Sequence, residues 1–186
     1  WANIGVVALD MQDPAQARQW LDQAHEAVMQ GPAGWLQAFV LHNLADVLYD
    51  QGDLAEAQEM AQAALQRFEA LGDSHYLPDP QLLLARIALN LGEMAAAEAL
   101  CATALAHYEE RGDAVVTASA WLVLAELAWR TGRPGEAATH FQHAQSLRST
   151  VKRPMSPRER ARYEALSRVL PASSSAPMAP RAKACI

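Results

Sequence analysis

Apolar residues recur along this chain at steps of three and four, the pattern of one buried helix face. The clearest run is Leu41, Leu44, Leu48, Ala57, Ala61, Ala64, Leu65 and Phe68. Gln51, Gly52 and Asp53 interrupt it in the middle. Because glycine adopts the left-handed backbone of a helix end without steric cost, this stretch predicts two helices joined by a tight turn.

The same pattern returns every 40 residues, four times and without an insertion. The aligned positions include Trp1, Leu41, Gln81 and Trp121, then Gln12, Gly52, Gly92 and Gly132, then Ala17, Ala57, Ala97 and Ala137, and finally Ala24, Ala64, Ala104 and Ala144. A fixed period of this length predicts a stacked array of helical hairpins rather than a globular enzyme. The alanines in register suit positions where two helices approach closely.

The pattern predicts an all-α chain. We expect helices at about residues 1–11, 14–30, 35–50, 54–71, 80–91, 94–111, 114–131, 134–148 and 157–169. The repeats then cover about 1–30, 35–71, 80–111 and 114–148, followed by a capping helix over 156–170 and a disordered Pro/Ser/Ala-rich tail over 171–186. Capping boxes are expected at 53–56 and 13–16, and Asp79 is expected to cap the helix that follows Pro78 and Pro80.

The aligned residues resemble the tetratricopeptide repeat: a large residue, Leu-Ala, Gly, Ala, an apolar residue and Ala. LADVLYDQGDLAEAQEMAQAAL and LAELAWRTGRPGEAATHFQHAQ match it closely. The resemblance covers about residues 1–148 and implies a right-handed α-solenoid with a concave, partner-binding groove. The usual period is about 34 residues; the longer period here is similar to repeats of large bacterial transcription activators and signal-transduction ATPases. Since Trp1 is itself a repeat position, we expect the chain to be cut from a longer protein.

In such proteins one face of each first helix lines the groove. Here that face holds His42, Asp46, Tyr49, Asp50, Leu82, Arg86, Leu89, Asn90, Leu122, Glu126, Trp129 and Arg130, with Ala2, Val6, Leu9 and Asp10 in the first copy. Large apolar residues among charges favour a partner surface with apolar anchors; the alternative is that they only pack the inner wall. The Lys/Asn/Arg clamp with which some members of the family bind acidic chaperone tails is absent.

Charge is unevenly distributed along the chain. Residues 151–186 hold eight basic and two acidic residues, a net charge of +6, so the first 150 residues carry −12. An acidic body is a poor ligand for polyphosphates, which disfavours nucleic acid as a partner. The Arg-rich face of the last helix, Arg158 and Arg162, is expected as a solvated cap surface; docking on the acidic body is the alternative. Without an 18-residue apolar run or a leader, we expect no membrane partner and a cytoplasmic, bacterial protein.

Candidate catalytic chemistry is sparse. His140 and His143 lie three residues apart, but the pattern places no third metal ligand beside them. Asp46 and Asp50 are expected as solvated carboxylates, and Cys101 and Cys185 as inert thiols. We therefore expect no enzyme, metal or cofactor. The leading hypothesis is a non-catalytic module that binds a protein or peptide in the groove, or self-associates; the alternative is a small-molecule sensor of a larger regulator.

Overall fold

The computed structural model describes residues 14–31 and 34–170, and these contain helices and turns but no strand. The helices are α2 (Pro14–Met29), α3 (Trp35–Gln51), α4 (Leu54–Ala70), α5 (Pro78–Leu91), α6 (Met94–Arg111), α7 (Ala114–Arg130), α8 (Pro134–Thr150) and α9 (Pro157–Val169). Each begins and ends within two residues of the range expected from the apolar pattern. The expected helix near residues 1–11 and the expected disordered tail lie outside the described residues.

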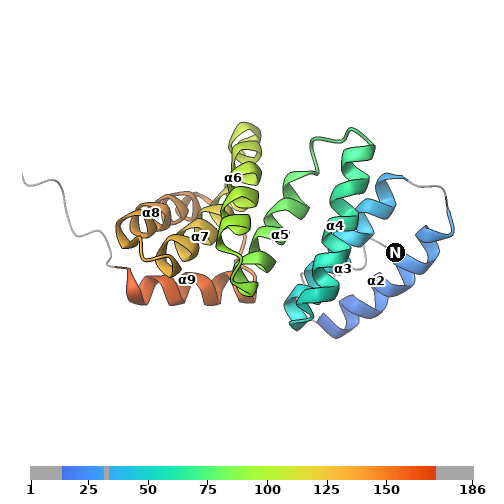
Figure 1. The fold of residues 1–186 in the computed structure, drawn as a ribbon, viewed down its shortest axis with the longest axis horizontal. Helices are drawn as coiled ribbons and strands as arrows, with labels where there is room; N and C mark the ends of the chain where they lie inside the picture. The colour runs from blue at the N-terminus through green and yellow to red at the C-terminus, as the bar shows by residue number, and fades with distance from the viewer. Residues whose placement is uncertain (1–13, 32–33, 171–186) are drawn as a thin grey trace, which may run out of the picture.

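Each helix from α2 to α7 packs against the next one along the chain, and α3, α5 and α7 also contact one another in turn. Figure 1 shows these helices stacked side by side in chain order, as an elongated array rather than a ball. The all-α solenoid predicted from the apolar period is therefore confirmed.

A glycine follows the first helix of each described pair within two residues. At Gly92, φ is +83°, and the next amide, of Glu93, donates to Ala88 O at 2.9 Å. Gly52 has the same left-handed backbone, with φ at +96°. A side chain at either position would strain the backbone, so the sequence places glycine where the chain must reverse.

Alanines lie where neighbouring helices approach most closely. In the second to fourth copies, the nine alanines at three of the repeated positions are completely buried: Ala45, Ala85, Ala125, Ala57, Ala97, Ala137, Ala64, Ala104 and Ala144. Around them, three apolar clusters follow one another along the array: the first joins α2 to α5, the second α5 to α7, and the third α7 to α9.

Two helix starts differ from expectation. Asp53 precedes α4, but its side chain makes no capping hydrogen bond, so no capping box forms there. Pro78 and Pro80 lie inside the first turn of α5. Backbone N–H groups in the first turn have no acceptor within the helix, so the N–H that proline lacks costs no hydrogen bond there. Asp79 is therefore a helical residue rather than the cap, and its Oδ1 accepts a hydrogen bond from the Tyr108 hydroxyl at 2.7 Å.

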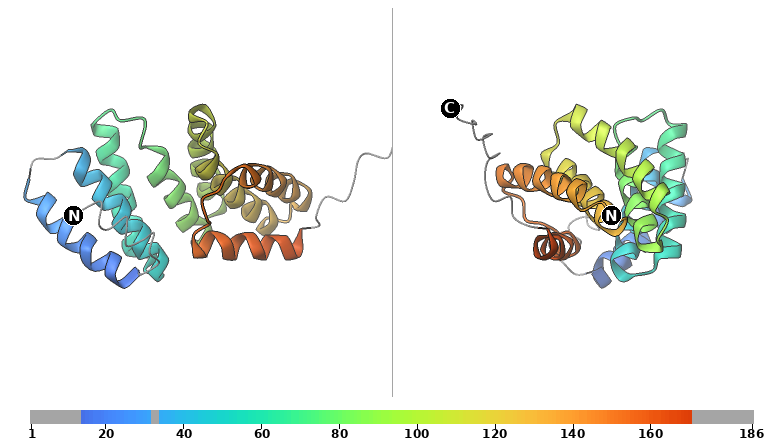
Figure 2. Two further views of the ribbon diagram at one scale, coloured as in Figure 1. Left: turned by 180° about the vertical axis from the view of Figure 1, so that it is seen from behind. Right: turned by 60° about the vertical axis from the view of Figure 1, so that its left-hand side comes forward.

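The connection after α8 leads back along the array, and the last helix lies against it (Figures 1 and 2). Figures 1 and 2 show α9 beginning below α5 and lying lengthwise along α7 and α8, joined to α8 by residues 151–156. Ser156 caps it, since its Oγ accepts the Glu159 amide at 3.2 Å. This position places the first turns of α9 against α3 and α7.

Candidate functional site

The predicted groove positions divide into buried and accessible residues. Leu82, Leu89 and Leu122 are 3%, 0% and 0% exposed and belong to the apolar clusters. The expected surface role is corrected for these three leucines, because neighbouring helices cover them completely. The first copy's positions Ala2, Val6, Leu9 and Asp10 lie outside the described residues.

The other predicted positions form what we call the first-helix face. It consists of His42, Asp46, Tyr49 and Asp50 on α3, Arg86 and Asn90 on α5, and Glu126, Trp129 and Arg130 on α7. Tyr49 is only 4% exposed, whereas Trp129 is 41% exposed. The face therefore has carboxylates, one buried aromatic ring and one accessible aromatic ring within a framework of packed helices.

Arg158 of α9 binds the α3 end of this face. Its Nε lies 2.9 Å from Asp50 Oδ1, and its terminal nitrogen donates to the Asp50 main-chain oxygen. The guanidinium also lies over the Tyr49 ring, 4.5 Å from the ring centroid. One arginine thus makes an ion pair, a main-chain hydrogen bond and a cation–π contact with two consecutive residues.

Arg162, one helical turn later, reaches α7. Its Nε lies 2.5 Å from Glu126 Oε2, and its side chain is only 11% exposed. A terminal nitrogen also donates to the Tyr49 hydroxyl at 3.4 Å. Burial acts to lower the pKa of this guanidinium, but Glu126 and Tyr49 outweigh it and raise the pKa above its ordinary value. The guanidinium of Arg162 is therefore charged, and the carboxylate of Glu126 balances its charge.

The remaining turns of α9 are held by apolar contacts. Leu166 and Leu170 are 3% exposed and join the cluster formed by α7 and α8. The Tyr163 ring lies 5.0 Å from that of Phe141, and Gln145 donates to the Tyr163 hydroxyl at 3.2 Å. The helix is thus attached by arginines at one end and by leucines at the other.

The solvated cap surface expected for Arg158 and Arg162 is therefore wrong, and docking on the acidic body is what the structure shows. The signal was present in the sequence: Arg158, Arg162, Leu166 and Leu170 follow at steps of four and share one helical face. The periodicity of the repeats could not predict which residues these four side chains contact, because α9 is not part of a repeat.

Asp50 is not the solvated carboxylate expected from the sequence. Burial, and then the like charge of Asp46, raise its pKa from 3.8 to about 6, although Arg158 and Arg86 act to lower it. Asp46, Tyr49, Asp50 and Arg158 line one small hollow of about 50 Å³. The pair of carboxylates is therefore part of a charged contact with α9.

Contacts between first helices complete the face. Asn90 donates to the Tyr49 hydroxyl at 3.3 Å, and Arg130 donates to Leu89 O at 3.0 Å. Arg130 also lies 2.5 Å from Glu126 Oε1, so Glu126 is bound by two arginines. The structure thus brings Tyr49, Asp50, Asn90, Glu126 and Arg130 into one network. His42 is not part of it, and its Nδ1 is buried without a hydrogen-bond partner.

The other residues considered from the sequence lie outside this network. Within the described ranges, no three His, Cys, Asp or Glu side chains gather as metal ligands. His140 and His143 pack on the Trp121 ring, at 5.1 and 4.8 Å between centroids. Cys101 is buried, which raises the pKa of its thiol to about 12. None of the described helices is both long and apolar enough to cross a membrane.

Comparison with known proteins identifies the repeat. The sequence matches the tetratricopeptide repeat over residues 1–70 and 76–150, which is most of the chain. The chain belongs to the tetratricopeptide repeat family. Proteins of this family generally mediate protein–protein interactions. No match is found among curated proteins.

Solved tetratricopeptide-type structures share this fold. One is the putative kinesin light chain of Podosopora anserina with nearly identical TPR-like repeats, at 17% identity and a TM-score of 0.65, covering 90% of this chain and 82% of that one. Another is BtubC (BKLC) from P. vanneervenii, at 15% identity and a TM-score of 0.67, covering 96% and 85%. At these identities the likeness concerns the fold alone.

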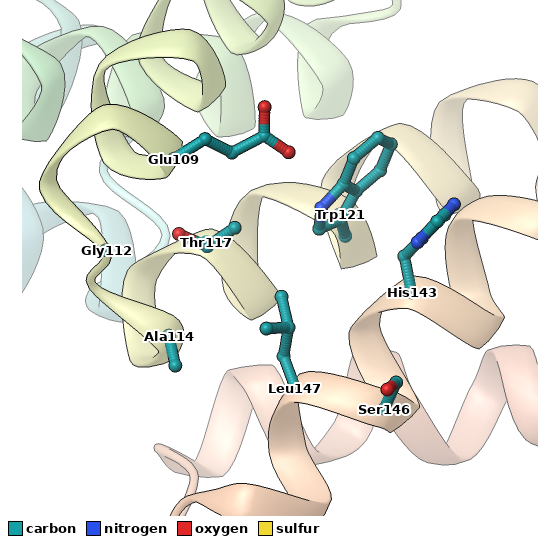
Figure 3. A pocket seen from close by; sticks show the side chains of 8 residues that line it. All are labelled: Glu109, Gly112, Ala114, Thr117, Trp121, His143, Ser146 and Leu147. Atoms are coloured by element: carbon teal, nitrogen blue, oxygen red, sulfur yellow. The ribbon is translucent and has the colours of Figure 1, made fainter.

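A second hollow of this tetratricopeptide array lies away from α9. It has a volume of about 330 Å³ and is lined by Glu109, Gly112, Ala114, Thr117, Trp121, His143, Ser146 and Leu147. Figure 3 shows Trp121 and Thr117 from α7 and Leu147 from α8 around the same space, with the Glu109 carboxylate at its edge. An indole wall with an imidazole and a carboxylate beside it could hold a small, partly apolar molecule.

Proposed function

We propose that this chain is a non-catalytic interaction module whose first-helix face binds a segment of another protein. The observation that carries the proposal is the set of contacts between this face and α9. Tyr49, Asp50 and Glu126 together bind two arginines of one helix through ion pairs and a ring contact. A face that makes these contacts with a helix of its own chain has the chemistry to make them with another helix.

Trp129 supports the same proposal. It is the most accessible aromatic side chain of the face and lines a hollow of about 190 Å³ between α7 and α9, together with Glu126, Arg162 and Val169. Exposed tryptophan beside charged groups is typical of residues that dominate binding energies at protein interfaces.

The test is a display selection of about 15-residue peptides on the intact chain, followed by binding measurements with Trp129→Ala. We expect the selected peptides to lose about tenfold or more in affinity with this variant, as a central aromatic contact is worth more than about 1.4 kcal/mol. Helical circular dichroism should be unchanged, because Trp129 is 41% exposed and belongs to none of the three apolar clusters.

Leu71→Ala is the matched control. Leu71 is 47% exposed, similar to Trp129, and follows the end of α4. Peptides that bind the first-helix face should bind this variant as they bind the unchanged chain. If all selected peptides ignore Trp129→Ala, the face does not bind partners and the proposed function is wrong.

The hollow lined by Trp121 and His143 favours a second candidate, a small-molecule sensor within a larger bacterial transcription regulator or signalling ATPase. Its volume of about 330 Å³ is at the lower end of the range for small-molecule sites, about 300–1,000 Å³. A thermal-shift screen of metabolites tests it: a saturable rise in melting temperature that is lost in Glu109→Gln would support a sensor. Stabilisation that survives this change would place the ligand elsewhere.

A further inference from the structure

The face of α9 that contacts the array contains a stripe with a residue at every fourth position. Arg158 contacts Asp50 and the Tyr49 ring, Arg162 contacts Glu126, and Leu166 and Leu170 enter the apolar cluster of α7 and α8. Residues four apart lie one above the other on a helix, so the first-helix face and the adjoining apolar cluster of α7 and α8 together match one face of a helix in one orientation.

The polar half of the face selects arginine. Tyr49 offers its ring to one guanidinium and its hydroxyl to the next. A planar guanidinium can stack on a ring and donate sideways to a carboxylate at the same time, whereas the ammonium of lysine is a point charge. A helix with acidic residues at these two positions would place like charges against Asp50 and Glu126, so the face rejects it.

The fit of α9 in this site is incomplete. Arg86 Nε and Glu159 Oε1 are both buried without a hydrogen-bond partner. Beside them is a hollow of about 530 Å³ lined by Asp46, Arg86, Ser119 and the residues that lead into α9. Protein interiors are close-packed and their buried polar groups are nearly all paired. Since α9 leaves Arg86 Nε unpaired beside this hollow, a partner helix that carries an acceptor there could make a contact that α9 does not make.

From these observations we infer that the first-helix face, together with the adjoining apolar cluster of α7 and α8, recognises a partner helix with arginines at positions 1 and 5 and leucines at positions 9 and 13. The partner displaces α9, which occupies this site in the structure. The inference rests on the proposed function and names the partner's chemistry. The six-residue connection to α8 keeps α9 at a high local concentration. The partner thus binds in competition with a segment of the chain itself.

The test uses the intact chain and a fluorescein-labelled peptide of residues 156–170 as the partner helix, with binding followed by fluorescence anisotropy. Two chain variants are compared, Arg158→Ala/Arg162→Ala and Arg160→Ala/Arg168→Ala. They remove the same charge from α9, but Arg160 and Arg168 are exposed, the latter with 75% of its side chain in solvent. We expect the first variant to bind the peptide about tenfold or more tightly than the second, because its own α9 competes less.

Variants of the peptide test the recognition pattern without altering the fold of the chain. Replacing the peptide's residues 158 and 162 by alanine should weaken binding about tenfold or more, and replacing residues 160 and 168 should change it less than about twofold. The peptide with Arg162→Glu should recover affinity for the chain with Glu126→Arg, since the charges of that pair are then exchanged.

Several outcomes would overturn the inference. Equal binding of both alanine peptides would show that arginine position is not recognised, and equal binding by both chain variants would show that α9 is not a competitor. A dimer in light scattering that depends on Arg158 and Arg162 would show that the occupant is α9 of a second copy. If peptides sensitive to Trp129→Ala lack the arginine pair and leave α9 docked, the proposed function stands and this inference alone fails.

Discussion

At the scale of single residues, the repeat is maintained by backbone conformation and side-chain volume. Gly92 has a left-handed backbone, and apart from its chain neighbours no residue has a heavy atom within 4 Å of where a β-carbon would lie. Gly135, inside the first turn of α8, has equal space but no positive φ. Comparing these two glycines therefore separates the need for a left-handed backbone from the need for space around a β-carbon.

Gly92→Ala should lower the free energy of unfolding by about 1–2 kcal/mol, the cost of a left-handed alanine. Gly135→Ala should be neutral or stabilising, because alanine is the better helix former. Urea denaturation of both variants measures the difference. Equal effects would mean that the backbone at Gly92 relaxes out of the left-handed conformation.

The charge of Asp50 gives a second prediction at this scale. Asp46→Asn removes the second-largest cause of its raised pKa, so the pKa of Asp50 should fall from about 6 towards its ordinary value. Carboxyl carbon NMR titration measures it. Glu56→Gln, which removes an exposed carboxylate of α4 that pairs with Arg18, should leave the pKa of Asp50 unchanged. An unchanged pKa in Asp46→Asn would show that burial alone causes the shift.

The sign of the pH dependence follows from the same pKa. In the folded protein Asp50 titrates at about 6, against 3.8 for an unperturbed carboxyl. Between these values the folded state binds a proton that the unfolded state does not, so this group increases the free energy of unfolding as pH falls from 6 towards 4. In Asp46→Asn this contribution should be smaller, which urea denaturation at pH 7 and pH 5 would show.

At the scale of elements, the sequence predicts α2 to α8 well because each helix depends on local information. Apolar spacing, alanines and single glycines all report contacts with the adjacent helix. The exposure of equivalent positions is not local: Tyr49, Leu89 and Trp129 align 40 residues apart, yet Leu89 is fully buried and Trp129 is 41% exposed. Their exposure depends on which neighbouring helices lie over them, and the period of one helix contains no information about that.

For a similar reason, the sequence predicts the docking of α9 on the acidic body only as an alternative to a solvated surface. Its ion pairs join Arg158 and Arg162 to carboxylates of two different copies, and many acidic residues of the body could have been the partners. The choice of Asp50 and Glu126 depends on where Leu166 and Leu170 fit between α7 and α8. The leucines must pack and the arginines must form ion pairs in the same position of α9. That position can be predicted only from the three-dimensional arrangement of the array.

Leu166→Ala should detach α9 while leaving the array folded. Leu166 is buried, and removing such a side chain costs about 2–5 kcal/mol. Amide hydrogen exchange should then rise in residues 157–169 far more than in α3 to α7. Val169→Ala is the control on the same helix, since Val169 is 44% exposed and should cost less than about 0.5 kcal/mol. Simultaneous loss of protection in α3 and α5 would mean that the array depends on α9 to fold.

At the scale of the whole molecule, the core is a series of three clusters rather than one centre. Stability in such an array is a sum of local and nearest-neighbour contributions, so a defect at one end should be felt mainly there. Phe68 of α4 and Phe141 of α8 are buried near opposite ends and offer a matched pair for testing this.

Phe68→Leu and Phe141→Leu should each cost about 1 kcal/mol, the scale of a conservative core exchange. Hydrogen exchange measured by mass spectrometry should rise in α3 to α5 for the first change and in α7 to α9 for the second. Loss of protection of equal size in all helices, for either change, would show that the array unfolds as one cooperative unit.

The contact between Arg158 and Asp50 joins residues 108 positions apart, and this separation orders events during synthesis. All residues of the first-helix face leave the ribosome before α9, and domains begin to fold as they emerge. For that interval the face has no internal competitor. A helix with the same arginine and leucine stripe that is present during translation would bind an open face, whereas the same helix added to the finished chain must wait for α9 to dissociate. Timing relative to translation, and not affinity alone, would then decide how much of the protein is bound.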